Sequence, residues 1–74
     1  MTEFPAISFR DLIARVKKLG FKPIRQKGSH FRFVHEDGRK TTIPDHGNKD
    51  VPRGLLMKII RIDLEMDMKT FLKQ

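Results

Sequence analysis

The stretch HFRFVHEDGRKTTIP, residues 30–44, decides the fold. Apolar and polar residues alternate on both sides of the polar segment EDG at residues 36–38, which is the pattern of two strands joined by a turn. A three-residue loop with glycine in the left-handed position is a common hairpin connection. The sequence therefore predicts a β-hairpin with strands at residues 30–35 and 39–44.

The loop length fixes the register of this hairpin. With three loop residues, the facing pairs are His35 and Arg39, Phe33 and Thr41, and Phe31 and Ile43. The two phenylalanines and the isoleucine then share one face, which must be the buried one. A two-residue loop would put the isoleucine on the other face, so we reject it. Because strand side chains alternate, His30 and Arg32 point away from the core, onto the open face of the sheet.

A helix is predicted before the hairpin. Ser8 and Asp11 form an S-x-x-D capping pattern at its start. Its apolar stripe follows helical spacing and consists of Phe9, Leu12, Ile13, Val16 and Leu19. Gly20 is expected to end the helix as a left-handed cap, with Phe21 packed back on the last turn.

The segment between this helix and the hairpin predicts a first strand at residues 22–26. Pro23 lies near its start and suits an edge strand, because proline lacks a backbone N–H donor. Residues 27–29, KGS, are expected to form the short connection to the strand that begins at His30. A sheet of three antiparallel strands follows.

After the hairpin, residues 45–50 are rich in turn-forming residues and predict a loop. Asp50 is expected to cap a second helix, with Pro52 tolerated in its first turn. The apolar side of that helix is predicted to contain Leu55, Leu56, Ile59, Ile60 and Ile62. Residues 67–72 predict one more short turn of helix, which includes Met68, Phe71 and Leu72.

The predicted element order is α-β-β-β-α with a short C-terminal helix, in the α+β class. Both main helices must cover the same side of the three-stranded antiparallel sheet, because only one face is apolar. This is the architecture of double-stranded-RNA-binding domains, although a fold alone does not give a function.

Composition narrows the class of protein. With 74 residues, the chain has room for one domain spanning residues 1–74. It has no cysteine, which excludes disulfides, thiolate catalysis and cysteine-rich zinc sites. No apolar run is long enough to span a bilayer, and no signal-peptide pattern opens the chain, so we expect a cytoplasmic protein. The net charge of +7 and the pI near 10.3 favour a polyanionic partner, either nucleic acid or an acidic protein.

His30 is the strongest candidate for chemistry. Its expected neighbours Arg25, Lys27, Arg32 and Lys49 are cations that could hold phosphate oxygens and stabilise negative charge in a transition state. Histidine can accept and donate protons near neutral pH, and RNA carries its own nucleophile, the 2′-hydroxyl. The residues alone leave two interpretations open: catalysis, or simple phosphate contact.

The remaining candidates have weaker signals. His35 is expected at the edge of the core in a structural role. His46 could reach the His30 patch as a second proton donor or phosphate contact, or could instead bond loop carbonyls. A zinc site from His30, His46 and Asp45 matches no known spacing, so we predict no metal and no cofactor. The predicted RNA-binding residues are Arg25, Lys27, Gly28, Ser29, Arg32, His46 and Lys49.

Four stretches carry a resemblance to a known family. They are LGF at residues 19–21, RQKGSH at 25–30, IPDH at 43–46 and KDVPRGLL at 49–56. Together they are similar to the HicA family, small toxins of bacterial and archaeal toxin–antitoxin pairs that cleave mRNA, over about residues 9–72. The chain departs from the family at Phe31, where many relatives have a second histidine. It also departs at LEMD, residues 64–67, where relatives often read L-G-M-S and where one extra residue precedes the motif.

The resemblance implies a metal-independent endoribonuclease, an mRNA interferase with His30 as its catalytic histidine. It also implies a HicB-like antitoxin as a protein partner, besides RNA. Two other classes stay open at this point. One is a non-catalytic RNA-binding module of the same fold. The other is a DNA-binding domain, which is disfavoured because no helix-turn-helix spacing is visible.

Overall fold

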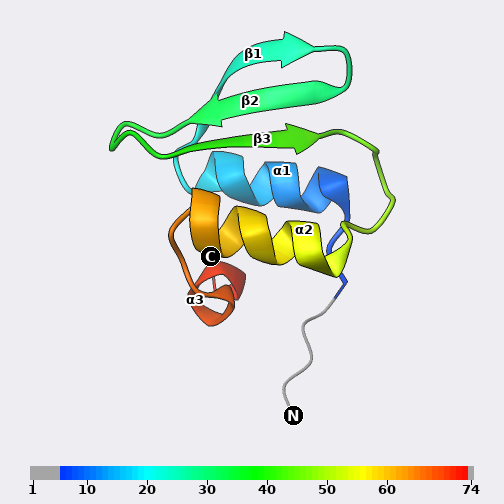
Figure 1. The fold of residues 1–74 in the computed structure, drawn as a ribbon, viewed down its shortest axis with the longest axis vertical. Helices are drawn as coiled ribbons and strands as arrows, with labels where there is room; N and C mark the ends of the chain where they lie inside the picture. Colours follow the sequence, from blue (N-terminus) through cyan, green and yellow to red (C-terminus); the bar gives the residue numbers. More distant parts are fainter. Residues whose placement is uncertain (1–5, 74) are drawn as a thin grey trace.

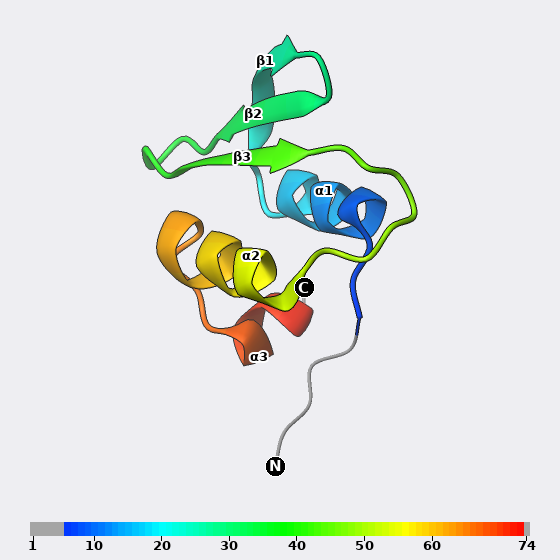
Figure 2. The same ribbon diagram turned by 45° about the vertical axis from the view of Figure 1, so that its right-hand side comes forward.

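The computed structural model of the protein describes residues 6–73. Its elements are α1 (Phe9–Lys18), β1 (Lys22–Lys27), β2 (His30–Val34), β3 (Lys40–Pro44), α2 (Arg53–Lys58), the π-helical turn η1 (Ile59–Asp63) and α3 (Met68–Leu72). The strands form one antiparallel sheet in the order β1-β2-β3. Both α1 and α2 lie on one side of this sheet, and α3 lies farther from it (Figures 1 and 2). The predicted α+β fold is confirmed.

Helix α1 begins and ends at the residues that the sequence predicts. The Asp11 backbone N–H donates to Ser8 Oγ at 3.0 Å, which satisfies an otherwise free donor at the N-terminus. At the other end Gly20 has φ +103°, a conformation that costs glycine little. The Gly20 and Phe21 N–H groups donate to the carbonyls of Lys17 and Val16, which forms a Schellman motif. Phe21 is buried against the core.

The β2–β3 hairpin has the predicted register. Phe33 pairs with Thr41, and Phe31 pairs with Ile43. The His35 N–H donates to the Arg39 carbonyl at 2.9 Å, so three residues form the loop and Gly38 takes φ +97°. Because the register holds, Phe31, Phe33 and Ile43 share the face toward the helices with the buried Thr41, while His30 and Arg32 face outward.

The β1–β2 connection is one residue shorter than predicted. Lys27 belongs to β1 and pairs with His30, which leaves Gly28 and Ser29 as a two-residue turn. Gly28 has φ +61°, which suits the glycine-first turns that join twisted strands. Farther back, the pairing shifts between Pro23 and Arg25 because a bulge accommodates one extra residue. All six residues of β1 are exposed.

The core lies between the sheet and the helices. Its buried members are Ile7, Phe9, Leu12, Val16, Phe21, Phe33, Ile43, Val51, Leu56, Ile59, Ile60, Leu64, Met68 and Phe71. Phe31 is half-buried and stacks on Phe33 at 6.4 Å between ring centroids, so the departure from the family at this position adds to packing.

The prediction that Asp50 caps the second helix is wrong. Pro52 is the residue before the first turn of α2, and no side chain caps that turn. Asp50 instead forms an isolated β-bridge with Ser8, and the Val51 N–H donates to the Ile7 carbonyl at 2.8 Å. This pairing holds the backbone extended up to the helix, so the Asp50 side chain does not cap it.

The expected burial of Ile62 is also wrong, since this residue is 67% exposed. The turn η1 has π-helical spacing, and the Leu64 N–H donates to the Ile59 carbonyl at 2.9 Å. A spacing of five residues places Leu64 over Ile59 and rotates Ile62 outward. Leu64 is fully buried as a result.

The break between η1 and α3 falls at Glu65, which has φ +55°. This is the left-handed conformation that a non-glycine residue adopts at a cost. Asp67 then caps α3 by accepting the Thr70 N–H at 2.6 Å. The short terminal helix is therefore confirmed, with Met68 and Phe71 buried and Leu72 half-buried.

Candidate nucleic-acid interface

His30 is the first residue of β2 and lies on the open face of the sheet. Its side chain is exposed, as the hairpin register predicts. It lies between Lys27 on β1 and Pro44 on β3. Pairing continues beyond it, because the Asp45 N–H donates to the Ser29 carbonyl at 2.6 Å. The backbone of His30 is therefore held on both sides while its ring faces solvent.

A groove of about 520 Å³ lies on this part of the open face. Its lining residues are Arg25, Gln26, Lys27, His30, Arg32 and Thr42. The sheet register arranges five of them in two cross-strand rows, which we call rungs. The first rung is Lys27, His30 and Pro44, and the second rung is Arg25, Arg32 and Thr42. No aspartate or glutamate occurs among the described residues that line the groove.

The turn beside the groove, Gly28 and Ser29, is exposed to solvent. Gln26 donates its side-chain amide to the Gly28 carbonyl at 3.0 Å, which fastens the turn from one side. A Cβ at Gly28 would meet nothing within 4 Å, so the glycine is explained by its positive φ and not by crowding. Gly28 and Ser29 are both exposed next to His30.

The structure brings together Arg25, Lys27, His30 and Arg32, with Gly28 and Ser29 in the adjoining turn. It does not place the two predicted residues of the β3–α2 loop in the groove. The His46 ring packs edge-on against Phe9, with 4.9 Å between ring centroids. Lys49 is exposed, and its backbone carbonyl accepts the Phe9 N–H at 2.9 Å. Roles for His46 and Lys49 in RNA binding stay predictions.

Two groove residues were missing from the sequence prediction. Thr42 pairs with Arg32, and this placement follows from the register that the hairpin loop already implied. Gln26 contributes to the lining beside Lys27, and no local pattern distinguishes it from an ordinary strand residue. Thr42 could therefore have been found from the sequence, whereas Gln26 could not.

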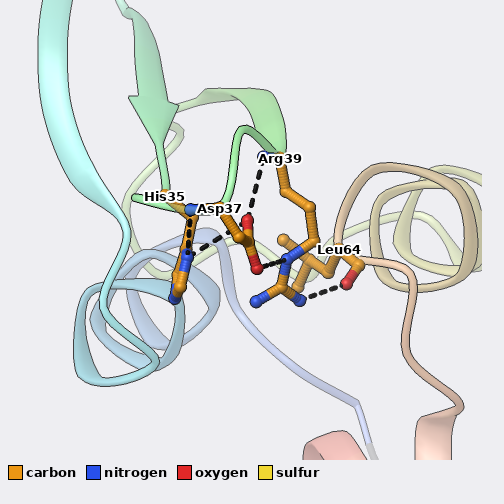
Figure 3. Close-up of polar contacts among 4 residues, drawn as sticks. All are labelled: His35, Asp37, Arg39 and Leu64. Carbon is orange, nitrogen blue, oxygen red and sulfur yellow. Dashed lines mark hydrogen bonds and ion pairs between the residues drawn. The ribbon is translucent and has the colours of Figure 1, made fainter.

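The far end of the hairpin is fixed by a polar cluster, which Figure 3 shows. The Arg39 guanidinium donates to Asp37 Oδ2 at 2.8 Å and to the Leu64 carbonyl at 2.5 Å. It also lies over the Phe21 ring, 5.2 Å from the centroid. Arg39 thus ties the β2–β3 loop to the end of η1. No pattern in the sequence predicts this contact.

Within this cluster the pKa of Asp37 lies below its ordinary value. The main cause is the Arg39 backbone N–H, which donates to the carboxylate at 3.0 Å, and the guanidinium adds to the effect. His35 Nδ1 lies 3.1 Å from Asp37 Oδ1, and its ring packs against Phe21 at 5.0 Å. His35 is half-buried at the edge of the core, as predicted.

The described part of the chain offers no obvious metal centre. Among residues 6–73, no three or more histidine, cysteine or acidic side chains gather in a way that could hold a metal ion. The same residues contain no helix that is long and apolar enough to cross a membrane.

Comparison with known proteins agrees with the resemblance in the sequence. A family model described as the HicA toxin of bacterial toxin–antitoxin matches residues 9–64, which is more than half of the chain. The match begins with α1 and ends at the last residue before Glu65. A search of curated proteins gave no match. The chain therefore belongs to the HicA family of toxins from bacterial toxin–antitoxin systems.

Proposed function

We propose that this HicA protein is a metal-independent endoribonuclease that cleaves mRNA, with His30 as its proton-transfer residue. The observation that carries the proposal is the placement of His30 in a groove whose charged residues are all cations. A histidine so placed can exchange protons near neutral pH, while the cations attract the phosphates of RNA.

The chemistry uses the 2′-hydroxyl of the RNA as the nucleophile. His30 takes the hydroxyl proton, the 2′-oxygen forms a bond to the adjacent phosphorus, and the bond from phosphorus to the 5′-oxygen breaks. The protonated ring, or water, returns a proton to the leaving 5′-oxygen. The products are a 2′,3′-cyclic phosphate and a 5′-hydroxyl end. Lys27, the cross-strand partner of His30, stabilises the negative charge that builds up on the reacting phosphate, while the two arginines of the second rung attract the RNA backbone beside it.

The test is RNA cleavage by wild-type protein and His30→Ala in the presence of EDTA. We expect the variant to lose cleavage by about 10² to 10⁴, the usual contribution of a positioned acid or base. Its free energy of unfolding should change by no more than about 0.5 kcal/mol, because the side chain is exposed. His46→Ala tests the alternative proton-transfer residue, and it should keep cleavage because its ring lies on Phe9 and outside the groove lining.

Cleavage by the His30→Ala variant at the wild-type rate would remove His30 from the mechanism. If His46→Ala alone lost activity, His46 would take its place. RNA binding without cleavage by wild-type protein would favour the alternative, a non-catalytic RNA-binding module of the same fold. An RNA with a single 2′-deoxy substitution at the cleaved nucleotide should resist the enzyme, because it lacks the nucleophile.

The protein partner implied by a toxin–antitoxin system is an antitoxin. We propose that a HicB-like antitoxin inhibits this toxin by covering the open sheet face. An acidic surface on that partner would match the net charge of +7 and the exposed cations of the two rungs.

A further inference from the structure

The second rung places two like charges directly opposite each other. Arg25 and Arg32 are cross-strand partners, and both are exposed on the open face. The ion pairs among residues 6–73 involve other cations, and no acidic side chain lines the groove. Like charges in this position destabilise a strand pair. An anion bound between the two guanidinium groups would offset this repulsion.

The first rung holds a separate group of donors. Lys27 and His30 lie two residues along their strands from Arg25 and Arg32 respectively. In an antiparallel sheet, side chains two residues apart on one face are separated by about 6.8 Å. A single phosphate is too small to be held fully by both rungs, whereas successive phosphates of one extended nucleic-acid strand are spaced on this scale.

We propose that the groove holds two consecutive phosphates of one RNA strand, one on each rung. The inference rests on the proposed function, because it places the reacting phosphate on the rung of Lys27 and His30. The neighbouring phosphate lies between Arg25 and Arg32, where guanidinium groups can bind its oxygens in a fork. The Thr42 hydroxyl lines the groove on the same rung and can donate to that phosphate. The RNA strand therefore follows the direction of β2.

The test uses a short RNA oligomer that contains one mapped cleavage position. A single neutral methylphosphonate linkage replaces the phosphate on the 5′ side or on the 3′ side of the cleaved linkage, or three linkages away. We expect one of the two adjacent replacements to lower kcat/KM by about ten- to a hundredfold, the range for a lost hydrogen-bonded charge contact. The distant replacement should change kcat/KM by less than about twofold.

Two variants connect this effect to the second rung. In Arg32→Gln, the ratio of kcat/KM between the natural and the neutralised oligomer should fall toward one. In Lys40→Gln the ratio should stay at its wild-type value. Lys40 is a matched control because it is an exposed cation of β3 outside the groove lining.

Two results would overturn the inference: equal cleavage of the natural oligomer and both adjacent replacements, or an undiminished ratio in Arg32→Gln. If cleavage does not require His30, the proposed function fails instead. In that case the two-phosphate arrangement is decided by the binding of the same oligomers with a 2′-deoxy substitution at the cleaved nucleotide, which keeps them intact. The adjacent replacement should then weaken binding about ten- to a hundredfold, and no weakening would refute the arrangement.

Discussion

Glu65 adopts a backbone conformation that suits glycine better than any other residue. Its φ of +55° lies at the end of η1, where the resemblance places a glycine in relatives. The Glu65→Gly variant should therefore gain about 1 kcal/mol in the free energy of unfolding, because a left-handed L-residue costs about that much. Urea denaturation measures the change.

Glu36→Gly is the control for that variant. Glu36 is also an exposed glutamate at a turn, but its φ is not positive, so glycine there should not stabilise the protein. A loss of stability in Glu65→Gly, or an equal gain in both variants, would show that the strain is absent.

Asp37 makes the stability of the β2–β3 loop depend on pH. Its pKa is lowered in the folded state, first by the Arg39 backbone N–H and then by the Arg39 side chain. The folded protein therefore releases this proton more readily than the unfolded chain does. The stabilisation is complete above the ordinary carboxyl value of 3.8 and is lost as the pH falls through the lower folded value.

We predict that the difference in stability between wild type and Asp37→Asn depends on pH. At neutral pH wild type should be the more stable protein, and the difference should shrink in acid below pH 3.8, where the wild-type carboxylate gains its proton. Thermal unfolding across a pH series measures both proteins. A difference that stays constant through the acid range would mean that the Asp37 charge contributes nothing.

At the scale of single elements, the β1–β2 hairpin should dominate RNA affinity. Arg25→Gln and Lys27→Gln should each weaken binding regardless of RNA sequence and reduce the salt dependence by about one phosphate contact. Lys17→Gln removes an equal charge from the exposed side of α1 and should leave the slope unchanged. Lys49→Gln tests the predicted role of the β3–α2 loop, because a reduced slope would extend the interface to that loop.

An unchanged slope in the Arg25 and Lys27 variants would place the RNA on another basic surface. If Lys17→Gln reduced the salt dependence as much as the Arg25 and Lys27 variants, the net charge of the protein, and not the groove, would determine RNA affinity.

Strand pairing was predictable where the loop length and the alternation of apolar and polar residues implied the same register. The segment EDG left one register that buried both Phe33 and Ile43, so the direction of His30 followed without a structure. The length of the β1–β2 turn was harder to predict, because Lys27 fits either the last position of the strand or the first position of the turn. A lysine beside a Gly-Ser pair does not indicate which of the two it occupies.

Errors occurred where distant parts of the chain decide the local structure. Asp50 pairs with Ser8, which lies more than forty residues earlier, and this contact overrides its preference for a helix start. Ile62 turns outward because of the π-helical spacing of η1, which apolar periodicity does not reveal. The position of His46 on Phe9 likewise depends on how a loop crosses the start of α1.

At the scale of the whole molecule, the open face should be shared by RNA and antitoxin. A co-expressed HicB-like protein should copurify with the toxin and lose affinity when RNA is present, because both would cover the exposed cations. Arg32→Gln should weaken both complexes, whereas Lys17→Gln should weaken neither appreciably. If RNA and antitoxin bind together with undiminished affinity, inhibition does not act by masking the groove.

The exposure of all six β1 residues has a consequence for the evolution of the protein. Figures 1 and 2 show that the β1–β2 hairpin is the part of the sheet farthest from the helices. Segments with few buried contacts open locally at a free energy well below that of global unfolding. Substitutions at the tip of this hairpin should therefore alter the proposed RNA site while the buried residues of α1, β3 and η1 keep the domain folded. If the proposed function holds, the toxin can acquire new RNA preferences, or lose its activity, without losing its fold.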